Sequence, residues 1–303
     1  MKLPKRILRF FYDSLFESTA AALRKKHIQG NKSIAWSECA ELTELYAAMK
    51  PAFSQPDFSD IDNIISQDPL KQTDVDLKLS AVGVIVETRK NERLEFVISN
   101  FIQQTGLSVQ LFHGTKNLPY ILAGKLHGYV KSGQVMLHEL GTDELDGAKY
   151  NALFLSESFW DAMIGRGKIF VFQADSCICP NSVFSLQDFL RFDYIGSRWS
   201  RKRPNGLIID GGVGGLSIRD WKKSVECLDA FPPRLWKGGE DGYFAFHIEL
   251  LGGQVGKVQD CGRFSTQEVF SHKSYGAHKI SCLPRGQRQK FIGYCPDAAF
   301  LLK

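Results

Sequence analysis

The stretch Leu79–Val86, LSAVGVIV, decides the fold, and the polar side chains of Glu87, Thr88 and Arg89 follow it directly. An eight-residue apolar run rich in β-branched residues is typical of a strand buried on both faces of a sheet. Similar runs predict further strands at 108–114, 134–137, 168–173 and 207–210, and helical patterns occupy 92–105, 118–131, 151–165, 184–191 and 217–229. Alternating strands and helices predict an α/β fold with a mostly parallel central sheet covered on both faces.

Composition limits the class of protein. The chain has 303 residues, of which 44% are apolar and 23% charged, so a disordered or fibrous chain is excluded. No apolar run approaches the ~18 residues of a membrane span. The seven cysteines are odd in number and scattered, and the basic N-terminus lacks the continuous apolar region of a secretory signal. We therefore expect reduced thiols and a cytoplasmic location.

The net charge of +5 belongs to the N-terminal region, because residues 1–30 carry seven basic and two acidic side chains. The remaining body is neutral, which argues against a nucleic-acid-binding surface. Helical patterns cover 7–26 and 33–50, and a proline-containing linker follows to residue 78. We expect a helical extension over 1–78 and one domain over 79–303. The basic helix either packs on that domain or makes a peripheral membrane contact.

Polar segments that follow strands are the candidates for chemistry, because ligands of α/β sheets bind where strands end. Glu87, Thr88 and Arg89 either bind a ligand at the sheet edge or form a solvated loop with a local ion pair. Asp175, after the predicted strand 168–173, either ligates a divalent cation that neutralises a diphosphate or caps a turn. The C-x-C pair Cys177 and Cys179 has the wrong spacing for a zinc site.

A glycine-rich segment, GGVGGLS at 211–217, is interpreted as a loop that lets the backbone approach a ligand. It fits neither the G-x-G-x-x-G pattern of dinucleotide sites nor the P-loop. Further along, Glu240 and Asp241 stand together among glycines. They either include a general base or open a helix with ordinary acidic residues.

Several motifs occur in an order that resembles a poorly characterised glycosyltransferase-like domain family. They are FLSESFW (154–160), FVFQADSCIC (170–179), FLRFDYIGSRW (189–199), GVGGLSIR (212–219), GEDGYF (239–244), FST (264–266) and YGAHK (275–279). The resemblance covers roughly residues 80–280. It implies a GT-A-like nucleotide-sugar-binding sandwich that transfers a hexose from a nucleotide sugar, a UDP-sugar in the first place, to a glycan or another hydroxyl acceptor.

The resemblance also implies roles for individual residues. The nucleotide would lie near Glu87, Thr88 and Arg89, and Asp175 would hold a Mn²⁺ or Mg²⁺ ion against the diphosphate, with His278 as a late metal ligand. The catalytic base would be Asp241 or Glu240. The donor and acceptor pocket would be shaped by Gly214, Gly215 and Ser217.

The sequence departs from the family pattern at three places. Ser176 and Cys177 follow Asp175, so the second carboxylate of a D-x-D motif is absent, and Val213 replaces the usual asparagine of the glycine motif. Ser197 and Arg198 replace the usual Ala-Pro before the tryptophan. Two alternatives therefore stay open: a non-catalytic module that binds a nucleotide sugar or glycan, and a nucleotidyltransferase.

Overall fold

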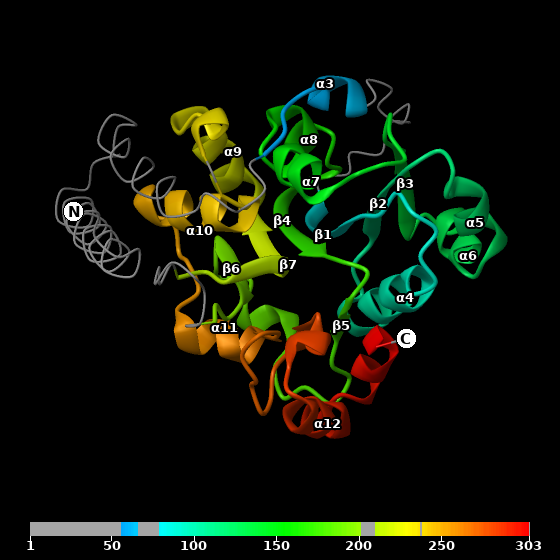
Figure 1. Cartoon of the computed structure of the whole chain (residues 1–303), viewed down its shortest axis with the longest axis vertical. Coiled ribbons are helices and arrows are strands. Elements are labelled where there is room, and N and C mark those ends of the chain that lie inside the picture. Colours follow the sequence, from blue (N-terminus) through cyan, green and yellow to red (C-terminus); the bar gives the residue numbers. More distant parts are fainter. Residues whose placement is uncertain (1–55, 66–78, 201–209, 237, 303) are drawn as a thin grey trace, which may run out of the picture.

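The computed structural model describes residues 56–65, 79–200, 210–236 and 238–302. Its centre is a six-stranded sheet in the order β3-β2-β1-β4-β7-β6 (Figure 1). The strands are β1 (Leu79–Val86), β2 (Val109–His113), β3 (Val135–Glu139), β4 (Gly165–Phe172), β6 (Tyr194–Ser197) and β7 (Val213–Asp220). Strands β1 to β4 are parallel, whereas β7 runs antiparallel to both β4 and β6. The predicted α/β fold with a mostly parallel sheet is confirmed.

Side chains of the central strands alternate between two hydrophobic cores. In β4, Ile169 and Val171 belong to one core, and Phe170 and Phe172 belong to the other. This alternation follows from the two-residue period of a strand. Both faces of the sheet are therefore buried, as the continuous apolar run of β1 predicts.

Helices cover both faces, and Figure 1 shows α7 to α10 on one side of the sheet and α4, α11 and α12 on the other. The first group, with its core residues in one cluster, consists of α3 (Ile61–Ile64), α7 (Gly147–Phe154), α8 (Glu157–Asp161), α9 (Trp221–Ala230) and α10 (Glu240–Leu250). The second group consists of α4 (Leu94–Thr105), α5 (Leu118–Ala123), α6 (Leu126–Lys131), α11 (Val258–Phe264) and α12 (Arg285–Tyr294).

A second, three-stranded sheet lies in the order β5-β9-β8. Its strands are β5 (Ser176–Ile178), β8 (Ser265–Thr266) and β9 (Gly276–His278), and short 3₁₀ helices η1 (Leu186–Asp188), η2 (Pro233–Leu235), η3 (Ile280–Cys282) and η4 (Pro296–Leu302) complete the chain. Because β5 follows β4 so closely, β9 and its last residue, His278, are held beside the end of the main sheet.

Three predictions about elements are wrong. The glycine-rich segment is not a loop: only Gly211 and Gly212 turn, with φ of +102° and +86°, and Val213–Asp220 is strand β7. Helix α9 consequently begins at Trp221 instead of 217, and the helix predicted over 184–191 is reduced to η1. The predicted strand at 207–210 and the N-terminal helices lie wholly or almost wholly outside the described residues.

The expectation of reduced thiols needs one correction, because Cys179 and Cys295 form a disulfide. This bond joins the residue after β5 to the residue between α12 and η4. The cysteines Cys177, Cys227 and Cys261 are free and buried, as expected of structural thiols. In the part of the chain that the structure describes, no helix combines the length and apolar character needed to cross a membrane.

Candidate functional site

The strand order of the sheet changes direction between β1 and β4. Strands β2 and β3 are added successively on one side of β1, whereas β4 is added on its other side. In open α/β sheets, ligands bind outside the carboxyl ends of strands at such a switch point. Glu87, Thr88 and Arg89 follow β1, and Gln173 and Asp175 follow β4, so two of the predicted segments meet there.

Glu87 organises the loop after β1. Its buried carboxylate accepts hydrogen bonds from the Arg89 backbone N–H at 3.0 Å, from Arg89 Nε at 2.8 Å and from Asn91 Nδ2 at 2.8 Å. Asn117, the residue before α5, donates to the carbonyl oxygens of Glu87 and Arg89 and fixes the same loop. Because its acceptors are already engaged, Glu87 is suited to orient Arg89 rather than to bind a ligand.

Arg89 is the exposed member of this pair, with 76% of its side chain accessible. The hydrogen bond and charge of Glu87 raise the pKa of the guanidinium, so Arg89 is a permanent cation at the switch point. Thr88 is buried. The loop therefore presents one oriented positive charge, which is the chemistry that binds phosphate oxygens.

Asp175 and His278 lie together, although they are far apart in the sequence. His278 Nε2 is 3.0 Å from Asp175 Oδ1 and 3.0 Å from Gln173 Oε1, and Nδ1 lies 2.9 Å from Gln267 Oε1. Burial opposes the charged carboxylate, but the hydrogen bond and charge of His278, with Lys279 and Arg93 nearby, hold the pKa of Asp175 below its usual range. Asp175 is thus an anion at neutral pH.

A divalent cation is the ligand that the carboxylate of this cluster would attract. Among the described residues, no group of three or more His, Cys, Asp or Glu side chains is placed to hold a metal ion. The cluster offers a carboxylate oxygen of Asp175 and the amide oxygen of Gln173, each 3.0 Å from His278 Nε2, which becomes a ligand only when it gives up the proton that it donates to Asp175. Mg²⁺ commonly binds through one or two carboxylates and completes its shell with water and substrate phosphates. These three side chains alone would leave most of the coordination shell of such a cation to water and a phosphate-bearing ligand.

The residues in place of a second D-x-D carboxylate offer no ligand to a cation in this cluster. Cys177 is buried in the core, and burial raises the pKa of its thiol. Ser176 donates its hydroxyl to the Gln173 carbonyl oxygen at 2.6 Å and stabilises the turn. Asp175 is accordingly the one carboxylate that this strand end supplies.

Gly214 and Gly215 permit close packing at the edge of β7. A Cβ on Gly215 would lie 2.0 Å from His278 Cε1, and one on Gly214 would lie 2.6 Å from Arg219 Nη2. Successive residues of a strand face opposite sides of the sheet. The absence of side chains at the two glycines therefore makes room for the His278 imidazole on one side of β7. On the other side it makes room for Arg219 and Asp241.

Arg219 and Glu240 form a buried ion pair, which the sequence did not reveal. Arg219 Nη1 lies 2.5 Å from Glu240 Oε2, and Nη2 lies 3.1 Å from Oε1. Ser217 accepts from Arg219 Nε at 3.1 Å and donates to the Gly214 carbonyl oxygen, so its hydroxyl is also used internally. Burial raises the pKa of Glu240, and Arg219 opposes that rise. This geometry gives Glu240 and Ser217 structural roles.

Asp241 is placed differently from its neighbour. It stands in the first turn of α10 and is half-buried, and its Oδ1 accepts from the Gly242 N–H at 2.7 Å. Its Cβ lies close to Gly214 at the edge of the sheet. Of the two adjacent carboxylates, Asp241 is the one with access to a ligand and is suited to accept a proton.

Sequence reasoning missed Tyr150, which lies between the cluster of Asp175 and Gln173 and the ion pair of Arg219 and Glu240. Its hydroxyl hydrogen-bonds with Gln173, and it lies within electrostatic range of Glu240 and Asp175. Burial raises the pKa of Tyr150, so it stays neutral. No local pattern around Tyr150 signals this position. Gln173 and Gln267, in contrast, lie within or directly after the motifs FVFQADSCIC and FST.

Comparison with known proteins gives one result that bears on this site. No curated protein matches the chain. Residues 138–281, just under half of the chain, are similar to a family described as "Protein of unknown function (DUF5672)". That segment includes Tyr150, Asp175, Arg219, Asp241 and His278, and the loop after β1 lies outside it.

Proposed function

We propose that the chain is a glycosyltransferase of GT-A-like fold that transfers a hexose from a nucleotide sugar, a UDP-sugar in the first place, to a hydroxyl acceptor. The observation that carries the proposal is the cluster of Asp175, His278 and Gln173 at the switch point between β1 and β4. Arg89 supplies a cation at the same edge of the sheet, and Asp241 supplies a carboxylate from α10.

The binding step follows from charge. The diphosphate of the donor carries negative charge that Arg89 offsets directly. Asp175 and His278, with the amide oxygen of Gln173, would hold Mn²⁺ or Mg²⁺, which supplies charge stabilisation for the leaving diphosphate. Gly215 keeps the imidazole of His278 at the sheet edge because no side chain intervenes.

The transfer step needs a proton acceptor. The acceptor hydroxyl oxygen forms a bond to the anomeric carbon, the bond from that carbon to the diphosphate oxygen breaks, and the nucleoside diphosphate leaves with the electron pair. Asp241 takes the hydroxyl proton, since it is half-buried and lacks the bidentate arginine partner of Glu240.

A non-catalytic nucleotide-sugar-binding module is the second candidate. It is favoured by the single carboxylate at the strand end, where Cys177 is buried and offers no ligand. A nucleotidyltransferase is the third, because its diphosphate chemistry would use the same strand ends.

The test incubates the full chain with UDP-, GDP- and ADP-hexoses and Mn²⁺, and measures release of nucleoside diphosphate and free sugar. The proposal expects release that is lost in Asp175→Asn and kept in Asp229→Asn, a control at an exposed position on α9. Binding without release would favour the module. Pyrophosphate release from a nucleoside triphosphate and a sugar phosphate would favour the nucleotidyltransferase.

A further inference from the structure

A lysine with an unusual backbone conformation follows His278. Lys279 has φ of +46° and ψ of +47°, which is the left-handed region. Among the described residues other than glycine, only Asp60 shares a positive φ. Aspartate tolerates this region better than lysine does, because its short polar side chain can hydrogen-bond locally. Since such backbone outliers gather at ligand sites, the side chain of Lys279 is a candidate for function.

The turn at Lys279 borders the switch-point site. The Lys279 N–H donates to the Asp175 carbonyl oxygen at 2.8 Å and so joins the end of β9 to the turn after β4. Glycine would adopt the same backbone at a lower cost, so the turn alone does not explain a lysine here. Lys279 is exposed, whereas the neighbouring His278 is buried. What lysine adds over glycine is an ammonium group at the surface of the site.

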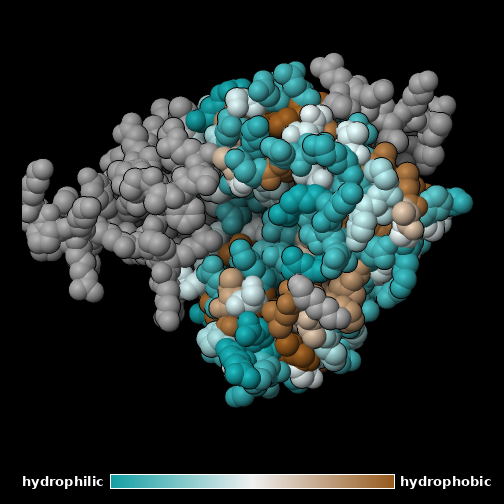
Figure 2. Space-filling view, turned by 45° about the vertical axis from the view of Figure 1, so that its right-hand side comes forward, coloured by the Kyte–Doolittle hydropathy of each residue, from teal (hydrophilic) through white to brown (hydrophobic). Residues whose placement is uncertain are grey.

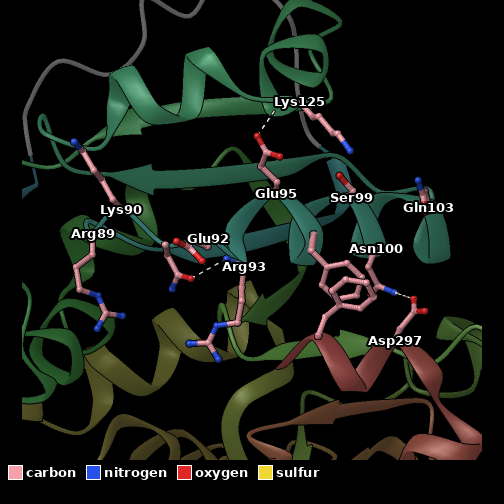
Figure 3. A pocket seen from close by; sticks show the side chains of 13 residues that line it. Arg89, Lys90, Glu92, Arg93, Glu95, Ser99, Asn100, Gln103, Lys125 and Asp297 are labelled. Atoms are coloured by element: carbon pink, nitrogen blue, oxygen red, sulfur yellow. Dashed lines mark hydrogen bonds between the residues drawn. The ribbon is translucent and has the colours of Figure 1, made fainter. Parts of the chain in front are cut away.

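Two arginines bring further positive charge to this edge of the sheet. Arg93 stands directly before α4, and its Nη1 donates to the Leu301 carbonyl oxygen at 3.1 Å, which restrains the guanidinium. Figure 3 shows that Arg89 and Arg93 extend to the same side of the loop after β1, whereas Lys90 extends to the opposite side. The two guanidinium groups are therefore presented together.

The three cations Arg89, Arg93 and Lys279, called the cationic cluster below, lie within electrostatic range of Asp175. The charges of Arg93 and Lys279 favour the anionic form of Asp175, and the charge of Asp175 favours the cationic form of Arg89. Glu87 pairs with Arg89. In the part of the chain that the structure describes, no salt bridge joins Arg93 or Lys279 to a carboxylate. Two of the three cations can therefore pair with a ligand.

The acidic side chains of the adjoining groove have other partners. This groove of about 880 Å³ runs along α4 from the loop after β1. Glu95 accepts from the backbone N–H before α6 at 2.7 Å, and Asp297 accepts from Asn100 at 2.8 Å. Glu92 lies near Tyr120, on which its charge acts. The groove acids are thus tied to other parts of the groove rather than to the cationic cluster.

The chemistry of the cluster selects an anion with several oxygens. Guanidinium and ammonium groups both bind phosphate oxygens through charge-assisted hydrogen bonds. A diphosphate spreads its oxygens over two phosphorus atoms and can contact cations that come from separate segments of the chain. Figure 2 shows that the described surface on this side of the molecule is largely hydrophilic, which suits the approach of a charged group.

We propose that the cationic cluster binds the diphosphate of a ligand directly at the switch-point site, and that Lys279 keeps its unfavourable backbone conformation because its ammonium group contacts that diphosphate. That the diphosphate belongs to a nucleotide sugar rests on the proposed function, whereas the binding of the anion does not.

The experiment measures binding of inorganic pyrophosphate, UDP and uridine to the full chain by calorimetry, in EDTA to remove divalent cations. We expect pyrophosphate and UDP to bind more tightly than uridine, and Lys279→Asn to weaken both by about tenfold. Asparagine tolerates a positive φ, so this variant should unfold at a urea concentration no lower than the wild type does. Lys279→Arg, which keeps the charge, should retain most of the affinity.

The matched control is Lys90→Asn, because Lys90 is an exposed lysine beside Arg89 that extends away from the cluster (Figure 3). It should bind pyrophosphate as the wild type does. The proposal is overturned if pyrophosphate does not bind, if Lys279→Asn binds it as the wild type does, or if Lys90→Asn weakens it equally. Weaker binding by Lys279→Asn together with a lower urea midpoint would also overturn it, since the lysine would then be structural.

Turnover of UDP-hexose with Mn²⁺ is measured on the same samples. Pyrophosphate binding that depends on Lys279, without turnover, supports the cationic cluster and contradicts the proposed function. Turnover by a chain whose pyrophosphate affinity does not depend on Lys279 does the reverse.

Discussion

The two adjacent carboxylates Glu240 and Asp241 should respond in opposite ways to loss of charge. Glu240→Gln removes the counter-charge of Arg219, whose side chain is 0% exposed, while Glu240 itself is 6% exposed. Breaking a buried pair from one side leaves an uncompensated charge and costs about 3–5 kcal/mol. Asp241→Asn, at a half-buried position in the first turn of α10, should cost less than about 1 kcal/mol.

The assay is equilibrium unfolding in urea, with turnover of the nucleotide sugar measured on the same preparations. Asp241→Asn should lower turnover by about 10²- to 10⁴-fold, the range of general acid–base catalysis. Joint replacement with Arg219→Met and Glu240→Leu should recover most of the stability that Glu240→Gln loses, because no unpaired charge is then buried. The reasoning is refuted if Glu240→Gln unfolds at the wild-type urea concentration. It is refuted equally if Asp241→Asn keeps wild-type turnover.

Three further predictions concern the other side of the site. Asp175→Asn should fold normally and lose turnover by at least about a hundredfold, because electrostatic stabilisation of a leaving group contributes several kcal/mol; wild-type turnover would remove Asp175 from the site. The folded pKa of Asp175 is held below its unfolded value of 3.8, so its stabilising contribution is complete above that pH and is lost as pH falls through the folded pKa. Urea unfolding at pH 7 and pH 3 should therefore show a smaller pH dependence in Asp175→Asn, and an equal dependence would contradict the assigned pKa. Gly215→Ala should displace the His278 imidazole and abolish turnover. Gly128→Ala, where an added Cβ meets nothing within 4 Å, should leave turnover unchanged and raise stability by about 0.5–1 kcal/mol, because Gly128 lies inside helix α6.

Much of the sheet could be predicted because its strands carry their own signal. The predicted strand Leu79–Val86 coincides with β1, and the strands at 108–114 and 168–173 overlap β2 and β4. Strand β7 could not be recognised from the sequence, because four of the five residues at 211–215 are glycines, a composition typical of a loop. The reason for those glycines is tertiary: His278 and Arg219 occupy the space on the two sides of the strand.

The structure brings several of the predicted site residues together, but the sequence did not indicate how they pair. Asp175 and His278 were both expected near a cation, and they lie 3.0 Å apart. Glu240 and Asp241 could not be distinguished, because the difference between them is a partner, Arg219, that lies 21 residues away. Side chains that pair across the core leave no periodic trace in the sequence.

The most direct test of the central claim is a titration of Mn²⁺ followed by electron paramagnetic resonance, with the full chain, with UDP, and with both. If Asp175, His278 and Gln173 hold the cation against a diphosphate, the signal of free Mn²⁺ should fall most when chain and UDP are both present. Asp175→Asn should abolish that additional loss, and Asp229→Asn should retain it. A Mn²⁺ signal that UDP alone explains, or one that falls equally with wild type and Asp175→Asn, would contradict a nucleotide-diphosphate site at the switch point.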